Sequence, residues 1–324
     1  MNKTLLDVRN LKLEFQTDDG IFRVLDGISL EIRKGINLGL VGETGCGKSV
    51  TANAIMGLIP KPAGRIVSGE ILLEGQDLLR LSEKELRKIR GKRISMIFQD
   101  PFTSLNPAYT IGDQISETIL LHQEVGGKSS AIEKTVDIME RVGIPQPADH
   151  LKDYPHQFSG GMRQRVMIAM ALSCNPSLLI ADEPTTALDV TIQAQVLELM
   201  GKLNQSREFS MLLISHDLGI ISQTCDEVAI MYAGCIVEWT SMENFFSNHQ
   251  HPYSQGLIGS IPQISHRQEI LKTISGNVPS LLNPPAGCRF HPRCSLVMDR
   301  CREEKPRMQE ISPGHRVACF KVAG

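Results

Sequence analysis

The chain has 324 residues, more than one hydrophobic core usually serves, so its length favours a large domain with an appendage or two domains. Hydrophobic residues make up 41% and charged residues 22% of the chain, which is typical of a folded globular protein and excludes a disordered one. The net charge of −2 and the 5% aromatic content argue against nucleic acid as a partner. The N-terminal stretch lacks the apolar centre of a secretory signal, and no apolar run is long enough for a membrane helix, so we expect a cytosolic protein.

The first third of the chain predicts mainly strands. Period-two alternation predicts strands within residues 4–41, the last of them an apolar run that leads into glycines and then a helix from Lys48. RIVSGEILLEG at residues 65–75 predicts a pair of strands, residues 82–92 a charged helix, and ISMIFQD at residues 94–100 a buried strand.

The rest of the chain alternates between helical and strand patterns. Helical periodicity dominates from about 112 to 175, and two apolar strands follow at residues 177–183 and 210–217 with a helix between them. Late strands are predicted at residues 228–239. Strands that alternate with helices predict an α/β core with a mostly parallel sheet.

A phosphate-binding loop is predicted at residues 42–49, where GETGCGKS fits G-x-x-x-x-G-K-[ST] between a strand and a helix. Its glycines permit a tight turn whose backbone N–H groups point at phosphate oxygens, beside the positive end of the following helix. Lys48 supplies a charge to the β- and γ-phosphates, and the Ser49 hydroxyl is a Mg²⁺ ligand. Cys46 is interpreted as a small filler, the alternative being a reactive thiol with a lowered pKa. The predicted ATP-binding residues of this loop are Gly42, Glu43, Thr44, Gly45, Cys46, Gly47, Lys48, Ser49 and Val50.

An acidic pair follows the buried strand in SLLIADEP at residues 177–184. Asp182 is placed to hold Mg²⁺ through water, and Glu183 to polarise the attacking water. Two surface carboxylates that merely close a strand would be the alternative, which the phosphate loop disfavours. The two motifs together predict hydrolysis of a nucleoside triphosphate.

FSGGMRQR at residues 158–165 lies between these motifs, and with it the chain resembles the ATP-binding cassette ATPases over residues 4 to about 245. The resemblance implies that Ser159, Gly160 and Gly161 contact the nucleotide of a partner subunit, so that two cassettes enclose two ATP molecules. Met162 stands where the family usually has glutamine, so side-chain contacts from this position are in doubt. Because the chain carries one copy of the motif, the second cassette comes from another chain, which we expect to be a different one.

The same resemblance implies roles for residues outside these three motifs. Gln99 in IFQD matches the glutamine loop and implies ATP and Mg²⁺ contacts, and His216 in LLISHD matches the histidine that touches the γ-phosphate and orients water with Glu183. Phe15 matches the residue that stacks on adenine, with core packing as the alternative. Ala187, Leu188 and Asp189 match the loop after the acidic strand.

Four further segments resemble ATP-binding subunits of bacterial dipeptide and oligopeptide importers, a subfamily that also handles nickel: FTSLNP after Gln99, EPTTALDVTIQAQVL from Glu183, HPYSQGL at 251–257 and NPPAGCRFHPRC at 283–294. The resemblance implies ATP-driven peptide import at the cytoplasmic face of the membrane. The implied partners are a second cassette subunit, two permease subunits, which the segment after Gln99 contacts, and an extracytoplasmic peptide-binding protein. A nickel importer is the alternative function, and a soluble cassette ATPase acting on nucleic acid or ribosomes a less favoured one.

The predicted fold class is therefore α/β, with two domains. Residues 1–250 are predicted to form an ABC ATPase domain with a P-loop, RecA-like core of mostly parallel sheet, an antiparallel β subdomain, and a helical subdomain at about 105–175. Residues 251–324 are predicted to form a small, metal-stabilised extension.

The extension holds four of the eight cysteines, Cys288, Cys294, Cys301 and Cys319, in the spacing C-x5-C-x6-C-x17-C. In a cytosolic protein such a cluster favours metal or redox chemistry over disulfides. The close C-x2-C pairs of zinc ribbons are absent, and four thiolates suit an iron–sulfur cluster, as some members of the importer subfamily carry. We therefore expect a [4Fe–4S] cluster, with zinc bound together with His291 or His315, or free or disulfide-bonded thiols, as alternatives.

Overall fold

The computed structural model describes residues 3–185, 189–261 and 273–322. The chain forms two compact units, one made of residues 1–5, 32–37 and 77–214, the other of residues 6–31, 38–76 and 215–324. This division does not test the predicted domain boundary at residue 250, which stays a prediction. Among the described helices, none has both the length and the apolar character needed to cross a bilayer.

Three parallel strands form the sheet of the first unit: β6 (Ile94–Ile97), β7 (Leu178–Asp182) and β8 (Ser210–Ser215), in the order β8-β7-β6. β7 and β8 are buried at every position, as expected for parallel strands covered on both faces. Asp182 ends β7 beside Ile214 of β8, so the acidic pair lies at the carboxyl edge of this sheet.

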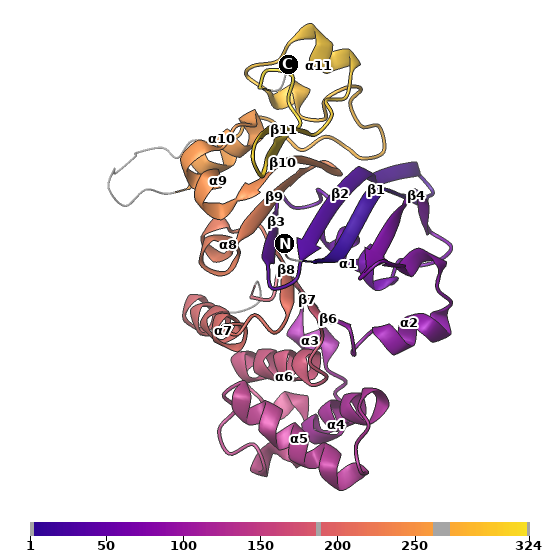
Figure 1. Cartoon of the computed structure of the whole chain (residues 1–324), viewed down its shortest axis with the longest axis vertical. Coiled ribbons are helices and arrows are strands. Elements are labelled where there is room, and N and C mark those ends of the chain that lie inside the picture. Colours follow the sequence, from indigo (N-terminus) through magenta and orange to yellow (C-terminus); the bar gives the residue numbers. More distant parts are fainter. Residues whose placement is uncertain (1–2, 186–188, 262–272, 323–324) are drawn as a thin grey trace. The chain divides into compact units, whose positions relative to one another are not determined.

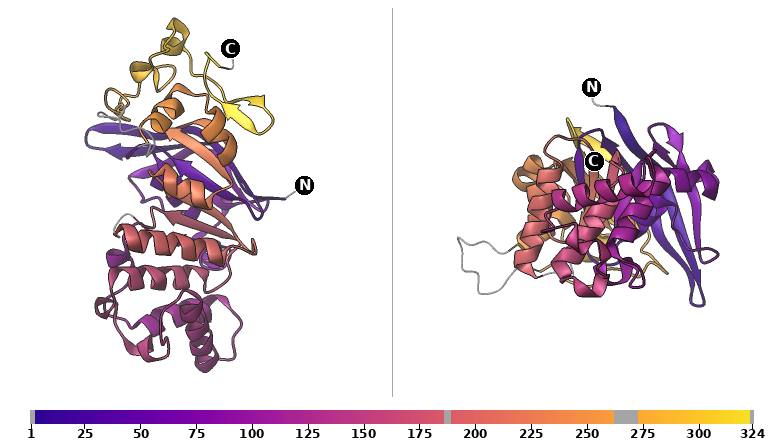
Figure 2. Two further views of the ribbon diagram at one scale, coloured as in Figure 1. Left: turned by 90° about the vertical axis from the view of Figure 1, so that its left-hand side faces the viewer. Right: turned by 90° about the horizontal axis from the view of Figure 1, so that it is seen from below.

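The helices of the first unit confirm the helical periodicity of residues 112–175. Figures 1 and 2 show α4, α5 and α6 packed against one another, and α6 also contacts β6 and α7. Thr110 caps α4 by accepting a hydrogen bond from the backbone N–H of Asp113 at 3.2 Å, which fixes where this helix begins. The helices are η1 (Leu78–Arg80), α2 (Glu83–Ile89), α3 (Pro101–Ser104), α4 (Ile111–His122), α5 (Lys128–Arg141), η2 (Asp149–Lys152), η3 (Pro155–Gln157), α6 (Gly160–Leu172) and α7 (Val190–Leu203).

The N-terminal strands of the second unit confirm the prediction that the first part of the chain is rich in strands. β1 (Thr4–Thr17), β2 (Gly20–Arg33), β4 (Gly64–Leu73) and β5 (Gln76–Asp77) form a sheet in the order β2-β1-β4-β5, with β1 and β4 antiparallel. The predicted pair of strands at residues 65–75 is wrong: β4 runs through Gly69, whose φ of 111° gives a local irregularity instead of a reversal.

A second group of strands in this unit has the order β11-β12-β10-β9-β3, formed by β3 (Asn37–Val41), β9 (Glu227–Tyr232), β10 (Cys235–Ser241), β11 (Gln309–Ser312) and β12 (His315–Val317). β3 and β9 are parallel, whereas β9, β10, β12 and β11 pair antiparallel in succession. The sequence did not predict β11 and β12, which bring the C-terminal extension alongside β10 (Figure 1). The helices are α1 (Lys48–Met56), α8 (Leu218–Thr224), α9 (Met242–Asn248), α10 (Pro252–Gly259), η4 (His291–Arg293) and α11 (Asp299–Glu303).

Candidate functional site

The predicted phosphate loop joins β3 to α1, where it needs glycine for two different reasons. A Cβ atom at Gly42 would lie 2.1 Å from the backbone oxygen of Met231, so the loop passes too close to β9 for any side chain. Gly47 caps α1 with a φ of 110°, a left-handed conformation that side chains disfavour. The loop tip at Thr44 and Gly45 is exposed, so a ligand can approach it from solvent.

Lys48 lies across this loop and is only 4% exposed. Its ammonium group donates hydrogen bonds to the backbone oxygens of Gly42 at 2.7 Å and Glu43 at 3.2 Å. The first turn of α1 therefore presents a cation and the positive end of a helix to the same loop, an arrangement that favours anions.

Cys46 fills the space beneath the loop, with 0% exposure. Burial raises the pKa of its thiol to about 11, so the thiol is protonated at neutral pH. Its backbone oxygen accepts a hydrogen bond from Gly234 at 2.8 Å, which ties the loop to the turn after β9. The interpretation as a filler is supported, and the alternative of a thiol with a lowered pKa is wrong.

Two residues of the extension, neither of them a predicted site residue, contact the loop. The hydroxyl of Tyr253 accepts a hydrogen bond from the backbone N–H of Glu43 at 3.0 Å. Arg293 pairs with the Glu43 carboxylate at 3.0 Å. Both lie inside the quoted segments HPYSQGL and NPPAGCRFHPRC, but nothing in those letters indicates a partner more than 200 positions away.

The acidic pair in the first unit is joined by the predicted glutamine. Asp182 is 5% exposed at the end of β7, and Glu183 follows it with a φ of 45°, a conformation that non-glycine residues rarely adopt. The backbone N–H of Glu183 donates to Ile214 at 2.9 Å, which holds this conformation. The side-chain amide of Gln99 donates to Glu183 Oε2 at 3.0 Å, so the structure brings these two predicted residues together.

The predicted signature opens α6. Ser159 is exposed and caps the helix by accepting from the backbone N–H of Met162 at 3.3 Å. Gly160 and Gly161 form the first turn, where a Cβ at Gly161 would lie 2.8 Å from Ile192 of α7. The positive end of α6 lies at this turn and favours anions, while the backbone N–H of Met162 is used by the Ser159 hydroxyl.

The remaining predicted residues take up the following places. Exposed His216 follows β8 directly, and Asp189 caps α7 through the backbone N–H of Ile192 at 3.0 Å. Ala187 and Leu188 lie outside the described residues. Phe15 is half-buried on β1 opposite Gly64 of β4, with its ring edge beside that glycine.

The four extension cysteines line one small pocket together with His251, Phe290 and His291. Burial raises the pKa of Cys288 to about 11 and also raises the pKa of Cys294 and Cys319, with neighbouring thiolates adding to the effect. Among the described residues, no group of three or more His, Cys, Asp or Glu side chains is arranged to hold one metal ion. Four cysteines thus line one pocket, but the described side chains are not arranged as a metal-binding group.

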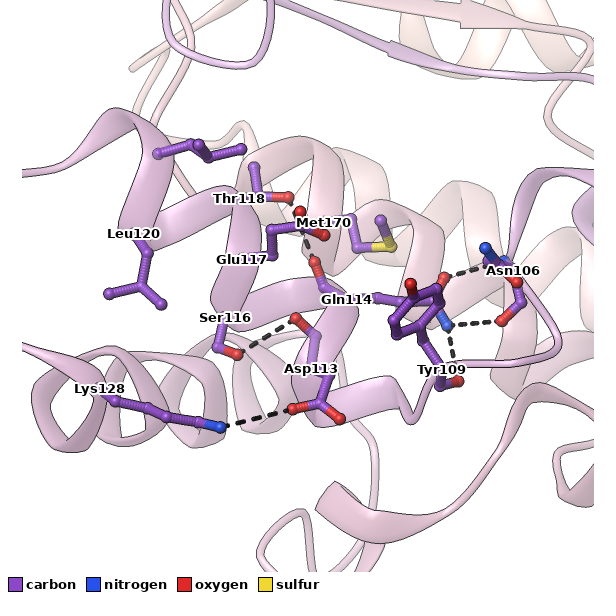
Figure 3. Close-up of a pocket in the computed structure, with 11 residues that line it drawn as sticks. Asn106, Tyr109, Asp113, Gln114, Ser116, Glu117, Thr118, Leu120, Lys128 and Met170 are labelled. Carbon is purple, nitrogen blue, oxygen red and sulfur yellow. Dashed lines mark hydrogen bonds and ion pairs between the residues drawn. The ribbon is translucent and has the colours of Figure 1, made fainter.

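A pocket of about 870 Å³ lies on the helical part of the first unit, beyond Gln99 in the chain (Figure 3). The side-chain amide of Gln114 donates to the backbone oxygens of Asn106 and Tyr109, each at 3.0 Å, and accepts from the N–H of Asn106 at 2.9 Å. These bonds hold the segment that precedes α4 in place. Tyr109 is 58% and Leu121 71% exposed beside the pocket, so large apolar surface is left open to solvent there.

Comparisons with known proteins agree with this geometry. A family model described as "ABC transporter" matches residues 25–186, and one described as "Oligopeptide/dipeptide transporter, C-terminal region" matches residues 237–301. The chain is 48% identical over 318 residues to the probable peptide ABC transporter ATP-binding protein y4tR of Sinorhizobium fredii, which covers 98% of this chain and 95% of that relative. It is 47% identical over 315 residues to the dipeptide transport ATP-binding protein DppD of Escherichia coli, covering 97% of this chain and 96% of that relative.

Solved structures show the same fold. The ATP-binding cassette MJ0796, solved as a dimer in a post-hydrolysis state with ADP and Pi, matches with a TM-score of 0.65 at 24% identity over 73% of this chain and 98% of that chain. The CbiO1 protein of Clostridium perfringens matches with a TM-score of 0.63 at 24% identity over 76% of this chain and 92% of that chain.

Proposed function

The chain belongs to the ABC transporter family of ATP-binding proteins, which makes it an ATPase, and from this premise we propose that it energises the import of dipeptides or oligopeptides across the cytoplasmic membrane. The observation that carries the proposal is the near-full-length similarity to peptide-transport ATP-binding proteins, including a matched C-terminal region. We place the chain at the cytoplasmic face of the membrane, as a peripheral subunit.

The proposed roles in hydrolysis follow from the chemistry of each group. Lys48 and the loop amides bind the phosphates; Ser49, Gln99 and Asp182 are the proposed Mg²⁺ contacts. Mg²⁺ would offset the charge that develops on the transferring phosphoryl group. Glu183 accepts the proton of the attacking water, and His216 orients that water.

Replacement of Glu183 by Gln tests the assignment of the general base. The amide keeps the shape of the side chain but cannot accept the proton, so turnover should fall by about 10²-fold or more while ATP binding persists. Unchanged turnover in this variant would refute the assignment.

Cargo is tested by uptake of labelled dipeptide and of nickel into vesicles that hold this chain, its partner cassette and candidate permease subunits. Dipeptide uptake that requires Lys48 supports the proposal, whereas nickel uptake alone supports the alternative. Co-purification with ribosomes or DNA in place of permeases would support the less favoured function, that of a soluble cassette ATPase acting on nucleic acid or ribosomes.

We also infer that the working form contains two cassettes, because the anion-binding start of α6 has no use within its own chain in the family arrangement. The partner is expected to be a different cassette chain. The Glu183→Gln variant loaded with ATP should form a stable complex with that chain, which sedimentation can measure. A monomer under these conditions, with the partner present, would contradict the inference.

The pocket in Figure 3 is the proposed contact with a permease. Gln114 fixes its rim, while Tyr109 and Leu121 offer exposed apolar surface to a partner helix. Leu121→Glu should release the chain from co-expressed permeases without changing its own ATPase activity. Ile21→Glu is the matched control, because Ile21 is an apolar residue 50% exposed on another surface. Equal binding by both variants would exclude this surface.

For the cysteine pocket we infer a [4Fe–4S] cluster held by Cys288, Cys294, Cys301 and Cys319. The support is that all four thiols line one pocket, which brings four thiolate donors of the kind that such a cluster uses to one place in the fold. When bound, the cluster would cross-link an extension with few large apolar residues.

Anaerobic purification tests the cluster by iron content and visible absorption. Cys301→Ser should lose both signals, whereas Cys174→Ser, a change outside the extension, should keep them. An anaerobic preparation without iron would overturn the cluster, and stoichiometric zinc would favour the alternative.

A further inference from the structure

Glu43, the second residue of the phosphate loop, adds a carboxylate to a segment that is predicted to bind a polyanion. Its backbone oxygen accepts a hydrogen bond from Lys48 at 3.2 Å, so this residue and the phosphate-binding lysine are direct neighbours. An unpaired negative charge on Glu43 would repel the phosphates of ATP, and water would screen this repulsion only in part because the Glu43 side chain is partly buried.

Arg293 of the extension neutralises that charge. Its Nη1 donates to Oε1 and Oε2 of Glu43, each at 3.0 Å. The Arg293 side chain is only 6% exposed and that of Glu43 29%, so the pair is partly shielded from water and salt.

The extension holds this guanidinium in place through its other donors. Arg293 Nε donates to the backbone oxygen of Ser275 at 3.0 Å, and Nη2 donates to that of Ile274 at 3.2 Å. The guanidinium also lies 5.8 Å from the ring centroid of Tyr232, within the range of a cation–π contact. Because these contacts already restrict the guanidinium, little side-chain conformational entropy is lost when it pairs with Glu43.

A second contact fixes the backbone of the same loop residue. The Tyr253 hydroxyl accepts from the N–H of Glu43 at 3.0 Å, and the Tyr253 ring packs on Tyr232 with centroids 4.7 Å apart. Phe290 packs on Tyr232 at 5.1 Å and lines the cysteine pocket. The segment from Cys288 to Cys294 therefore contacts both the cysteine pocket and the neighbourhood of the loop.

We propose that Arg293 is a positioning residue that cancels the Glu43 charge inside the phosphate loop, so that the C-terminal extension sets the affinity of the cassette for ATP. The proposal depends on this loop binding ATP, which a Lys48→Ala variant checks separately. Arg293 acts through Glu43 in this proposal: its Nη1 donates to Glu43 and Tyr232, while Nε and Nη2 donate to the backbone oxygens of Ser275 and Ile274.

The test compares the dissociation constant for MgATP, measured by calorimetry on the full chain, across a charge-removal cycle. Arg293→Gln should weaken binding by at least about fivefold, because it leaves Glu43 negative beside the phosphates. The double variant Arg293→Gln, Glu43→Gln should return to within about twofold of the wild type, because no charge then needs neutralising.

Arg302→Gln is the control, since Arg302 is an exposed arginine of the same extension. It should bind MgATP as the wild type does. The proposal is overturned if Arg293→Gln binds normally, or if the double variant stays as weak as the single one, which is the result expected of a purely structural contact. If the wild type does not bind MgATP, or if Lys48→Ala binds it normally, the assignment of residues 42–49 as the ATP-binding loop is wrong instead.

Discussion

The amide of Gln99 donates a hydrogen bond to Oε2 of Glu183 across 3.0 Å. Gln99 follows β6 and Glu183 follows β7, so the ends of two adjacent parallel strands place them side by side. Because Glu183 Oε2 accepts this hydrogen bond, the carboxylate is oriented, and the direction in which Oε1 can accept a proton is fixed.

Gln99→Leu should therefore lower kcat by about tenfold or more, because the proposed base loses its orientation and Mg²⁺ loses a proposed contact. Steady-state ATPase kinetics measure this. Gln205→Leu, at an exposed position, is the control and should behave as the wild type. A Gln99→Leu variant with normal kcat would show that the hydrogen bond has no part in turnover.

Gly42→Ala should disturb the phosphate loop, because the new methyl group would lie 2.1 Å from the backbone oxygen of Met231 and 2.8 Å from Cys46 Sγ. Both neighbours are fixed, so the loop has to move away from β9. We expect MgATP affinity to fall by about tenfold or more, measured by calorimetry.

Gly201→Ala is the matched control in α7, where a Cβ would meet no atom within 4 Å. Alanine should stabilise this helix by about 0.5–1 kcal/mol in urea unfolding and leave ATP affinity unchanged. Comparable ATP affinity in the two alanine variants would contradict the steric account of Gly42.

Asp26 should make the protein sensitive to acid. Although burial opposes ionisation, the ion pairs with Lys305 at 2.8 Å and Arg289 at 3.1 Å hold the pKa of Asp26 below its usual 3.8. A carboxyl group with a depressed folded-state pKa stabilises the protein above its unfolded pKa, and this stabilisation is lost as pH falls through the folded value.

The free energy of unfolding should therefore drop more steeply in the wild type than in Asp26→Asn between neutral pH and about pH 3. Chemical denaturation at both pH values measures the difference. Asp19→Asn, at an exposed position, should keep the wild-type slope. Parallel pH profiles for the wild type and Asp26→Asn would show that these ion pairs do not affect stability.

Cys46 should resist alkylation in the folded protein. Its thiol is 0% exposed and burial raises its pKa to about 11, so both access and thiolate are lacking near neutral pH. Iodoacetamide followed by peptide mass spectrometry should find Cys46 unmodified in the native state and modified after unfolding. Equal rates in the two states would mean that the loop opens readily.

Local patterns predicted what depends on neighbours in the chain. The glycine loop stands between a strand and the helix that Lys48 begins because that motif encodes its own turn. Asp182 ends, and Glu183 follows, a strand whose other residues are apolar. The sequence predicted that Gln99 and Glu183 both take part in ATP chemistry, but it did not predict the hydrogen bond between them.

Two kinds of feature were beyond the sequence pattern. The prediction of two strands at residues 65–75 failed because pairing of β4 with β1 keeps one strand extended through Gly69. The ion pair of Arg293 with Glu43 joins positions 250 apart, and an arginine between two cysteines carries no mark of its partner. Its position depends on the packing of Tyr232, Tyr253 and Phe290, which only the folded chain reveals.

The antiparallel pairing of β12 with β10 has a practical consequence for anyone who shortens this protein. Glu238 pairs with Val317 and Trp239 with Arg316. A chain cut after residue 250 would therefore leave β10 as an unpaired edge strand, although β10 is buried at all but its last position in the full chain. An unpaired, apolar edge strand can pair with strands of other molecules and cause aggregation. In the full chain the edge strand is β11, whose positions are mostly exposed and polar. The shortest well-behaved version of this cassette should therefore reach past Val317.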